Sequence, residues 1–255
     1  MTLVLTLVAV CLLVGLLLGF VGAGGAGVMV SLLTLGFDLP IHQAVGTSLA
    51  AMFFVTISGS ISHFREGNMN VRAGLLVGIS GILGAVAGAD IGQSIPPHIL
   101  QPMAGFALWF LAFLVFVRSR LSGKLVTSHD PSATVPTVKQ TAATIALGAT
   151  GGVASAFFGV GMAPYMQLGM LTILRLPLIK TIGTTMLALV FISMGGSIAL
   201  ASHGDVSVPH LIGATIGMTI GSYVGAKFTR RAPVKVLRAA IVLTPFVAGT
   251  LLILP

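Results

Sequence analysis

The stretch LPIHQAVGTSLA, residues 39–50, returns later in the chain as LPLIKTIGTTML, residues 176–187. Each copy has a Leu-Pro pair and, six residues after the proline, a glycine followed by two small hydroxyl residues. An offset of 137 residues, kept without gaps, relates the two stretches and also aligns residues 22–89 with residues 159–226. Self-similarity at a fixed offset is the mark of an internal repeat, so we interpret the chain as a duplication.

Composition places this duplicated chain in a membrane. Hydrophobic residues make up 56% of the 255 residues and charged residues only 7%, with a mean hydropathy of +1.08, whereas soluble domains carry about 25% charged residues. Apolar runs of about 20 residues, the length that crosses a bilayer, follow one another along almost the whole chain. A sizeable soluble domain is therefore excluded, and we interpret the net charge of +8 as loop charge rather than as a surface for nucleic acid.

Each copy is predicted to contain five helical segments, of which the second is short. The segments are 2–21, 24–37, 42–63, 71–92 and 98–118 in the first copy, and 139–157, 161–174, 179–200, 209–227 and 235–254 in the second. At 1.5 Å per residue a second segment reaches only about 21 Å, less than the hydrocarbon core of about 30 Å. We predict an all-α integral membrane protein whose repeats, residues 1–120 and 139–255, flank a linker at 121–138.

Charge predicts how the repeats are oriented. All Lys and Arg residues fall in four clusters, which are Arg65 and Arg72; Arg118, Arg120, Lys124 and Lys139; Arg175 and Lys180; and Lys227, Arg230, Arg231, Lys235 and Arg238. The positive-inside rule places these clusters in the cytoplasm. Corresponding loops differ in sign, because Asp38 aligns with Arg175 and Asp205 lies opposite the loop of Arg72. An odd number of crossings per repeat then predicts inverted topology, a cytoplasmic linker at 121–138 and both termini outside the plasma membrane.

Inverted repeats, short helices and glycine breaks are together typical of secondary transporters, whose binding sites lie at the repeat interface near the midplane. The glycines of GFVGAGGAGVMV, residues 19–30, also have the G-x-G-x-x-G spacing of dinucleotide-binding loops. That motif needs a preceding strand and a following acid about 20 residues on. An apolar helix precedes it here and Asp38 comes too early, so we expect no nucleotide.

The paired motifs resemble a known family. The pairing of GAGGAG (22–27) with FFGVGMAP (157–164), and of the two Leu-Pro stretches, is similar to the TauE/SafE family of sulfite exporters and anion permeases, over nearly the whole chain. The resemblance implies a membrane carrier, not an enzyme, for sulfite, other sulfur oxyanions or organosulfonates, with members also assigned to other small anions. With the inverted repeats, we expect export by alternating access at a midplane site, without a cofactor. One departure is that Pro164 replaces Gly27 in the second copy, so the two half-sites are not equivalent.

Backbone amides and hydroxyls are the candidate anion donors. Helix N-termini attract anions through free N–H groups and the positive end of the helix dipole. The turn glycines that would present such amides are Gly22, Gly24, Gly25, Gly159 and Gly161, and the doubled motif contributes Gly46, Thr47, Ser48, Gly183, Thr184 and Thr185. We expect the four hydroxyls to face a central cavity. The alternative is that they bond back to a preceding carbonyl and that the glycines serve helix packing.

Three ionisable residues are candidates for further roles. Lys180 aligns with Gln43 and either attracts anions from the cytoplasm or is a flanking residue that snorkels. His42 either titrates and donates to the substrate or is an interfacial histidine. Asp90 is the one acid within or beside a predicted span, which makes it the candidate proton-coupling residue, with a structural role at the outer helix end as the alternative.

Other functions stay open as alternatives. A divalent-cation permease would need carboxylates or histidine clusters, and the chain has five acids in all and histidines only at segment ends. The sequence GISG, residues 78–81, is similar to the nucleophile motif of rhomboid serine proteases, but no histidine lies mid-helix as a base. A scaffold or sensor without transport is the third alternative. The single cysteine, Cys11, excludes a disulfide within the chain, no metal site is expected, and the oligomeric state is not predicted.

Overall fold

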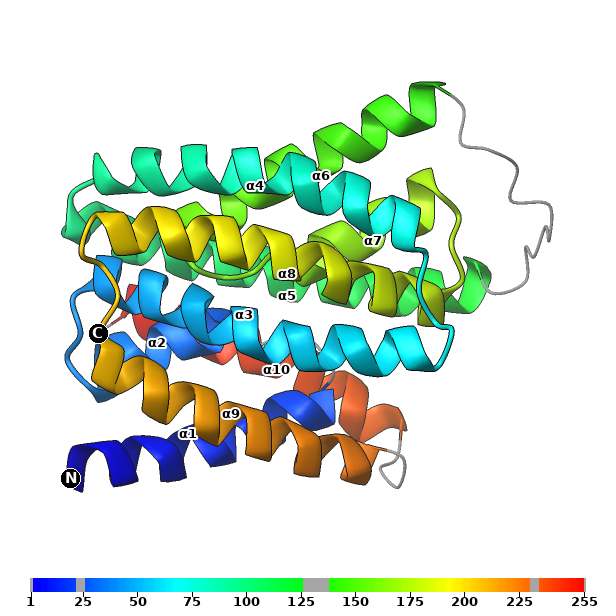
Figure 1. The fold of residues 1–255 in the computed structure, drawn as a ribbon. Helices are drawn as coiled ribbons and strands as arrows, with labels where there is room; N and C mark the ends of the chain where they lie inside the picture. The colour runs from blue at the N-terminus through cyan, green and yellow to red at the C-terminus, as the bar shows by residue number, and fades with distance from the viewer. Residues whose placement is uncertain (1, 22–25, 126–137, 230–233, 255) are drawn as a thin grey trace.

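The protein is all-helical in the part that the structure describes, residues 2–21, 26–125, 138–229 and 234–254 of a computed structural model. Ten helices lie within these residues (Figure 1): α1 Thr2–Val21, α2 Ala26–Gly36, α3 Ile41–Arg65, α4 Val71–Gln93, α5 Pro97–Leu125, α6 Val138–Phe158, α7 Ala163–Ile173, α8 Leu178–Ser202, α9 Val208–Thr229 and α10 Val234–Ile253. Each predicted segment corresponds to one of these helices, which confirms the all-α fold.

Helix lengths confirm that the second segment of each repeat is short. In the described residues, five helices are long and apolar enough to cross a membrane: α3, α4, residues 97–117 of α5, α6, and residues 179–202 of α8. By contrast α2 and α7 have 11 residues each, or about 16 Å at 1.5 Å per residue. Helix α5 continues to Leu125 instead of ending at 118, because no proline follows and Arg120 and Lys124 are good helix formers.

Each repeat packs mainly against the other repeat. Helix α1 lies along α9, and its repeat counterpart α6 lies along α4; α3 lies along α8, and α5 along α10. Figure 1 shows α9 alongside α1 at one side of the bundle and α6 alongside α4 at the other. The contact of α1 with α9 corresponds to that of α6 with α4 when the two repeats are interchanged. The packing is therefore consistent with two repeats related by a pseudo-two-fold axis.

The third helices of the two repeats run antiparallel. Near the start of α3, Gly46 touches the backbone carbonyl of Asp205 in the α8–α9 turn so closely that no side chain would fit. Near the start of α8, Gly183 touches the carbonyl of Asn68 in the α3–α4 turn in the same way. These are the same contact after a shift of 137 residues. The N-terminus of each helix thus lies at the C-terminal end of the other, as inverted repeats require.

Backbone conformation repeats as well. Asp38 and Arg175, which precede the two Leu-Pro pairs, both adopt left-handed conformations with φ of 52° and 50°. Gly67 and Gly204, in the turns after α3 and α8, do so with φ of 70° and 82°. Non-glycine residues rarely adopt this conformation. Its occurrence at aligned positions indicates that both halves follow the same chain path.

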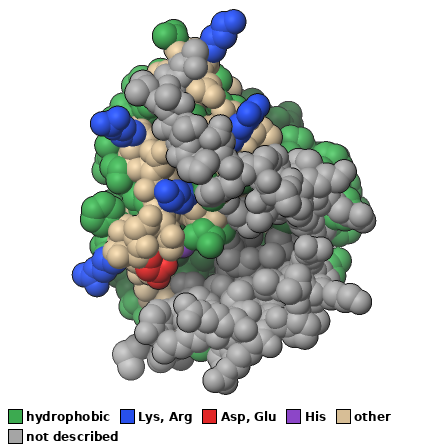
Figure 2. Space-filling model, turned by 90° about the vertical axis from the view of Figure 1, so that its right-hand side faces the viewer, with side chains coloured by type: hydrophobic (Ala, Val, Ile, Leu, Met, Phe, Trp, Pro, Cys, Tyr) green, Lys and Arg blue, Asp and Glu red, His purple; other side chains and the backbone are tan. Residues whose placement is uncertain are grey.

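Charged side chains gather at opposite ends of the helix bundle. The basic side chains whose placement is described, Arg65, Arg72, Lys139, Arg175 and Lys180, lie at the end where α5 stops and α6 starts, and Figure 2 shows Lys and Arg side chains spread over this end. The acids Asp38, Asp90 and Asp205 lie at the other end, where α1 starts and α10 stops (Figure 1), whereas Glu66 lies next to Arg65 at the basic end. Between the ends the surface is apolar: Leu83 is 74% exposed and Phe113 60%, as expected of a surface that contacts lipid.

Candidate functional site

A buried helix break lies between α6 and α7. Residues 159–162 are all buried, and Gly159 and Gly161 have φ of 68° and 72°. Glycine is required at position 159 for two reasons. Its φ is positive, and a Cβ there would come within 2.9 Å of Val45 Cα and Val30 Cγ2. The glycine turn predicted for the second repeat is thus a break in the protein interior. Its counterparts in the first repeat, Gly22, Gly24 and Gly25, lie outside the described residues.

The break leaves the N-terminus of α7 without a side-chain cap. Met162 precedes the helix with φ of 36°, and its own side chain makes no capping hydrogen bond. Pro164 occupies that turn and has no N–H group, as is common at the start of a helix. Free amides at a helix N-terminus carry a partial positive charge. A region of positive potential therefore lies inside the protein, made by backbone dipoles.

Two threonines of the doubled motif join the repeats. Thr47 Oγ1 accepts a hydrogen bond from the backbone N–H of Ser207 at 3.0 Å, and Thr184 Oγ1 accepts one from the N–H of Asn70 at 2.9 Å. Both hydroxyls belong to fully buried residues. Ser207 and Asn70 directly precede α9 and α4, so each threonine links the third helix of one repeat to the fourth helix of the other.

Three hydroxyls of the motif donate to carbonyls. Thr185 donates to the carbonyl of Thr181 at 2.8 Å and Thr184 donates to that of Lys180 at 2.6 Å. Both bonds return to the preceding turn of α8, which is the back-bonding arrangement given above as the alternative. Ser48 instead donates to the carbonyl of Gly159 at 3.4 Å and so reaches the helix break. A role of these hydroxyls in substrate binding stays a prediction.

The three ionisable candidates lie at the ends of the bundle. Lys180 is exposed at the basic end. At the acidic end, His42 Nε2 lies 3.2 Å from the carbonyl of Gly92, and Asp90, whose side chain is 60% exposed, lies 3.1 Å from His203 Nε2. At this end Gln93 also donates to Asp205. These contacts fasten the C-terminal end of α4 to α3 and to the α8–α9 turn.

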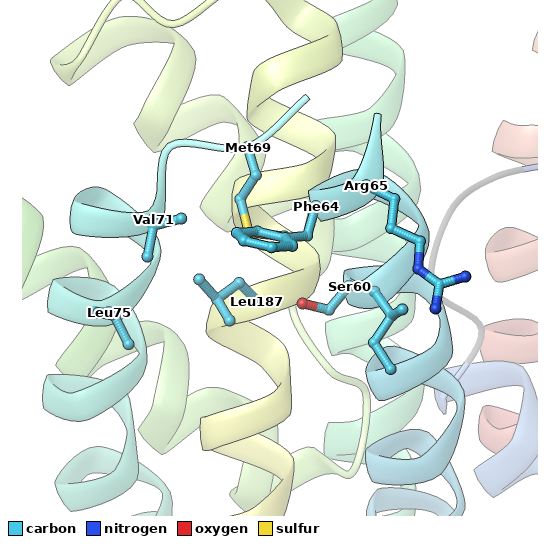
Figure 3. Close-up of a pocket in the computed structure, with 8 residues that line it drawn as sticks. Ser60, Phe64, Arg65, Met69, Val71, Leu75 and Leu187 are labelled. Atoms are coloured by element: carbon cyan, nitrogen blue, oxygen red, sulfur yellow. The ribbon is translucent and has the colours of Figure 1, made fainter. Parts of the chain in front are cut away.

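A cavity of about 360 Å³ between α3, α4 and α8 does not contain the predicted site. Figure 3 shows Phe64, Met69 and Leu187 grouped on one side of α3, and the guanidinium of Arg65 extends away from Met69. The wall of the cavity is mostly apolar, and none of the predicted site residues lines the cavity. We interpret it as a crevice on the lipid-facing surface.

The sequence did not single out some of the residues that matter here. Asn70 and Ser207 were missed although they align at the 137-residue offset and are both residue types that cap helices. Ser155 and Gln167, on the helices that flank the break, are 0% and 1% exposed. A polar residue within a turn or so of a glycine break is the signal that points to them.

Comparison with known proteins gives consistent matches. The family model described as Sulfite exporter TauE/SafE matches residues 7–252. The chain is similar to the probable membrane transporter protein YdhB of Bacillus subtilis, with 39% identity over 97% of this chain and 99% of that protein. It is also similar to the probable membrane transporter protein YjnA of Bacillus subtilis, with 27% identity over 91% and 94%, and to a probable membrane transporter protein of Xylella fastidiosa, with 26% identity over 85% and 83%. No solved structure gives a significant match.

Proposed function

The chain belongs to the sulfite exporter TauE/SafE family of membrane transporters, and from this premise we propose that it exports small sulfur-containing anions such as sulfite or organosulfonates from the cytoplasm. The observation that carries the proposal is the buried break between α6 and α7, where α7 begins inside the protein without a cap from the Met162 side chain. An anion in the membrane needs donors without a permanently buried charge, and helix N-termini provide them. In the described residues, hydroxyls and a glutamine are buried but no charged side chain is.

The contacts exchanged between the repeats support a proposal of alternating access. Gly46 and Thr47 hold the α8–α9 turn at the acidic end, and Gly183 and Thr184 hold the α3–α4 turn at the basic end. We propose that one repeat rocks against the other so that one of these contacts loosens while the other stays closed. Basic side chains at the cytoplasmic end would raise the local anion concentration. Asp90 is the proposed proton-coupling residue at the opposite end.

Transport by purified protein tests the proposal. Proteoliposomes containing the chain should take up sulfite and methanesulfonate down an imposed gradient well above the rate of protein-free liposomes, because the carrier supplies a path that the bilayer lacks. Boiled protein reconstituted in the same lipid is the control. If the folded protein moves neither anion under an inward or an outward proton gradient, the proposed substrate class is wrong.

Cysteine labelling tests the proposed orientation. Cys11, the one native cysteine, is buried, and we expect replacing it with alanine to give a background without reactive thiol. Glu66→Cys at the basic end and Ser94→Cys at the acidic end are both exposed positions. In intact cells a membrane-impermeant maleimide should label residue 94 and not residue 66, because basic loops face the cytoplasm. Labelling at both positions, or at 66 alone, would contradict the orientation.

A further inference from the structure

Ser155 is a buried hydroxyl without a partner. It lies on α6 one turn before the helix break, its residue is 0% exposed, and its Oγ has no hydrogen-bond partner among the described residues. Buried polar side chains are nearly always paired, because an unpaired hydroxyl keeps its desolvation penalty. The hydroxyl of Ser155 is therefore available to a bound molecule; the other buried side-chain atoms without a partner in the described residues, on Thr34, His63, His210 and Thr215, lie on helices other than the two that flank the break.

The position of Ser155 directs it toward the N-terminus of α7. One turn earlier on the same face of α6, Gly151 contacts the side chains of Met166 and Tyr165, since residues four apart share a helix face. Helices α6 and α7 also pack against each other on the two sides of the break. Because Ser155 lies one turn closer to the break than Gly151, we infer that it faces the first turn of α7, which the Met162 side chain does not cap.

We propose that the Ser155 hydroxyl and the first-turn amides of α7 together donate hydrogen bonds to the oxygen atoms of a monovalent oxyanion, such as hydrogen sulfite or a sulfonate. The inference rests on the proposed function and names the half-site that binds. Both donors are dipoles, and no charged side chain is buried among the described residues. The cost of moving an ion into a low-dielectric interior grows with the square of its charge, so dipoles alone favour a monoanion over sulfate.

The site belongs to the second repeat alone. The residue aligned with Ser155 at the 137-residue offset is Leu18, and the residue aligned with Pro164 is Gly27. Leucine offers no donor, so the first repeat has no equivalent hydroxyl at this position. One anion per chain is the expected stoichiometry.

Binding of methanesulfonate to the purified full chain tests the inference. Wild type should bind it with a stoichiometry of one by titration calorimetry, and Ser155→Ala should weaken binding about 10- to 100-fold, the range for a hydrogen bond to a charged group. Sulfate should not compete. Thr215→Val on α9 is the matched control, because it also removes a buried hydroxyl without a partner; its affinity should equal that of wild type. Without anion, Ser155→Ala should keep the wild-type Tm, whereas a merely structural role would lower it.

Each result has one consequence. If wild type transports and binds methanesulfonate but Ser155→Ala binds equally well, or if Thr215→Val weakens binding as much, the inference is wrong and the proposed function stands. If sulfate competes at equal concentration, the preference for monoanions is wrong. If wild type neither binds nor transports any of these anions, the proposed function fails, and the inference with it.

Discussion

Replacing Gly84 with alanine should remove most of the folded protein, whereas the same change at Gly92, on the same helix, should leave it near the wild-type level. A Cβ on Gly84 would run into the backbone carbonyl of Ala149 on α6 and lie within 3.0 Å of Val153 N. Backbone atoms cannot turn aside as a flexible side chain can. The helices would have to separate along their interface, at a cost of about 1–3 kcal/mol or more, and every contact between α4 and α6 would loosen.

The control has the same chemistry without the clash. A Cβ on Gly92 would meet Phe157 at 3.7 Å or more, which is ordinary van der Waals contact. Gly221, the repeat counterpart of Gly84, touches the carbonyl of Leu12 on α1, so Gly221→Ala should be as harmful as Gly84→Ala. Size-exclusion chromatography of detergent-solubilised fluorescent fusions, with thermal melting of the recovered fraction, measures all three variants. Equal profiles for Gly84→Ala and Gly92→Ala would contradict the close packing of α4 on α6.

Helix positions could be predicted well because bilayer thickness and hydrophobicity act locally along the chain. The segment predicted at 42–63 is α3, Ile41–Arg65, and the short segment predicted at 161–174 is α7, Ala163–Ile173. In lipid the backbone N–H and C=O groups of each apolar run must bond to each other, so each run forms a helix. The predicted end at 118 was wrong for a local reason too, because α5 continues through Arg120 and Lys124 to Leu125 and these residue types extend helices readily.

Hydrogen-bond partners could not be predicted in the same way. Thr47 was selected for its hydroxyl, but its partner Ser207 lies 160 residues away, and only the packing of the repeats brings them together. The repeat offset aligned Lys180 with Gln43, yet Lys180 is exposed at the end of the bundle. Alignment between repeats transfers the chain path but not the chemistry of a side chain. The same limit hid Ser155, whose repeat counterpart is an ordinary leucine.

Thr184→Val should reduce anion transport about tenfold or more, and Thr47→Val should do the same. Valine keeps the shape of the side chain but removes the oxygen that accepts the N–H of Asn70 or of Ser207. A buried amide left without an acceptor costs about 1–3 kcal/mol. Because each bond ties one repeat to a helix start of the other, we expect its loss to change the balance between the two open states. Initial rates of sulfite uptake into proteoliposomes, normalised to reconstituted protein, measure the effect.

Two variants separate this role from general damage to the helix. Thr184→Ser keeps the hydroxyl and should retain most of the transport rate. Thr185→Val changes the next residue, whose hydroxyl donates to Thr181 within its own helix and also contacts Met170 Sδ, so it should cost much less. If Thr185→Val is as harmful as Thr184→Val, the bond between repeats has no special role. If Thr47→Val and Thr184→Val shift the uptake and release rates in opposite directions, each threonine keeps a different end of the protein closed. Rocking between inverted repeats requires such opposite effects, because one end opens while the other closes.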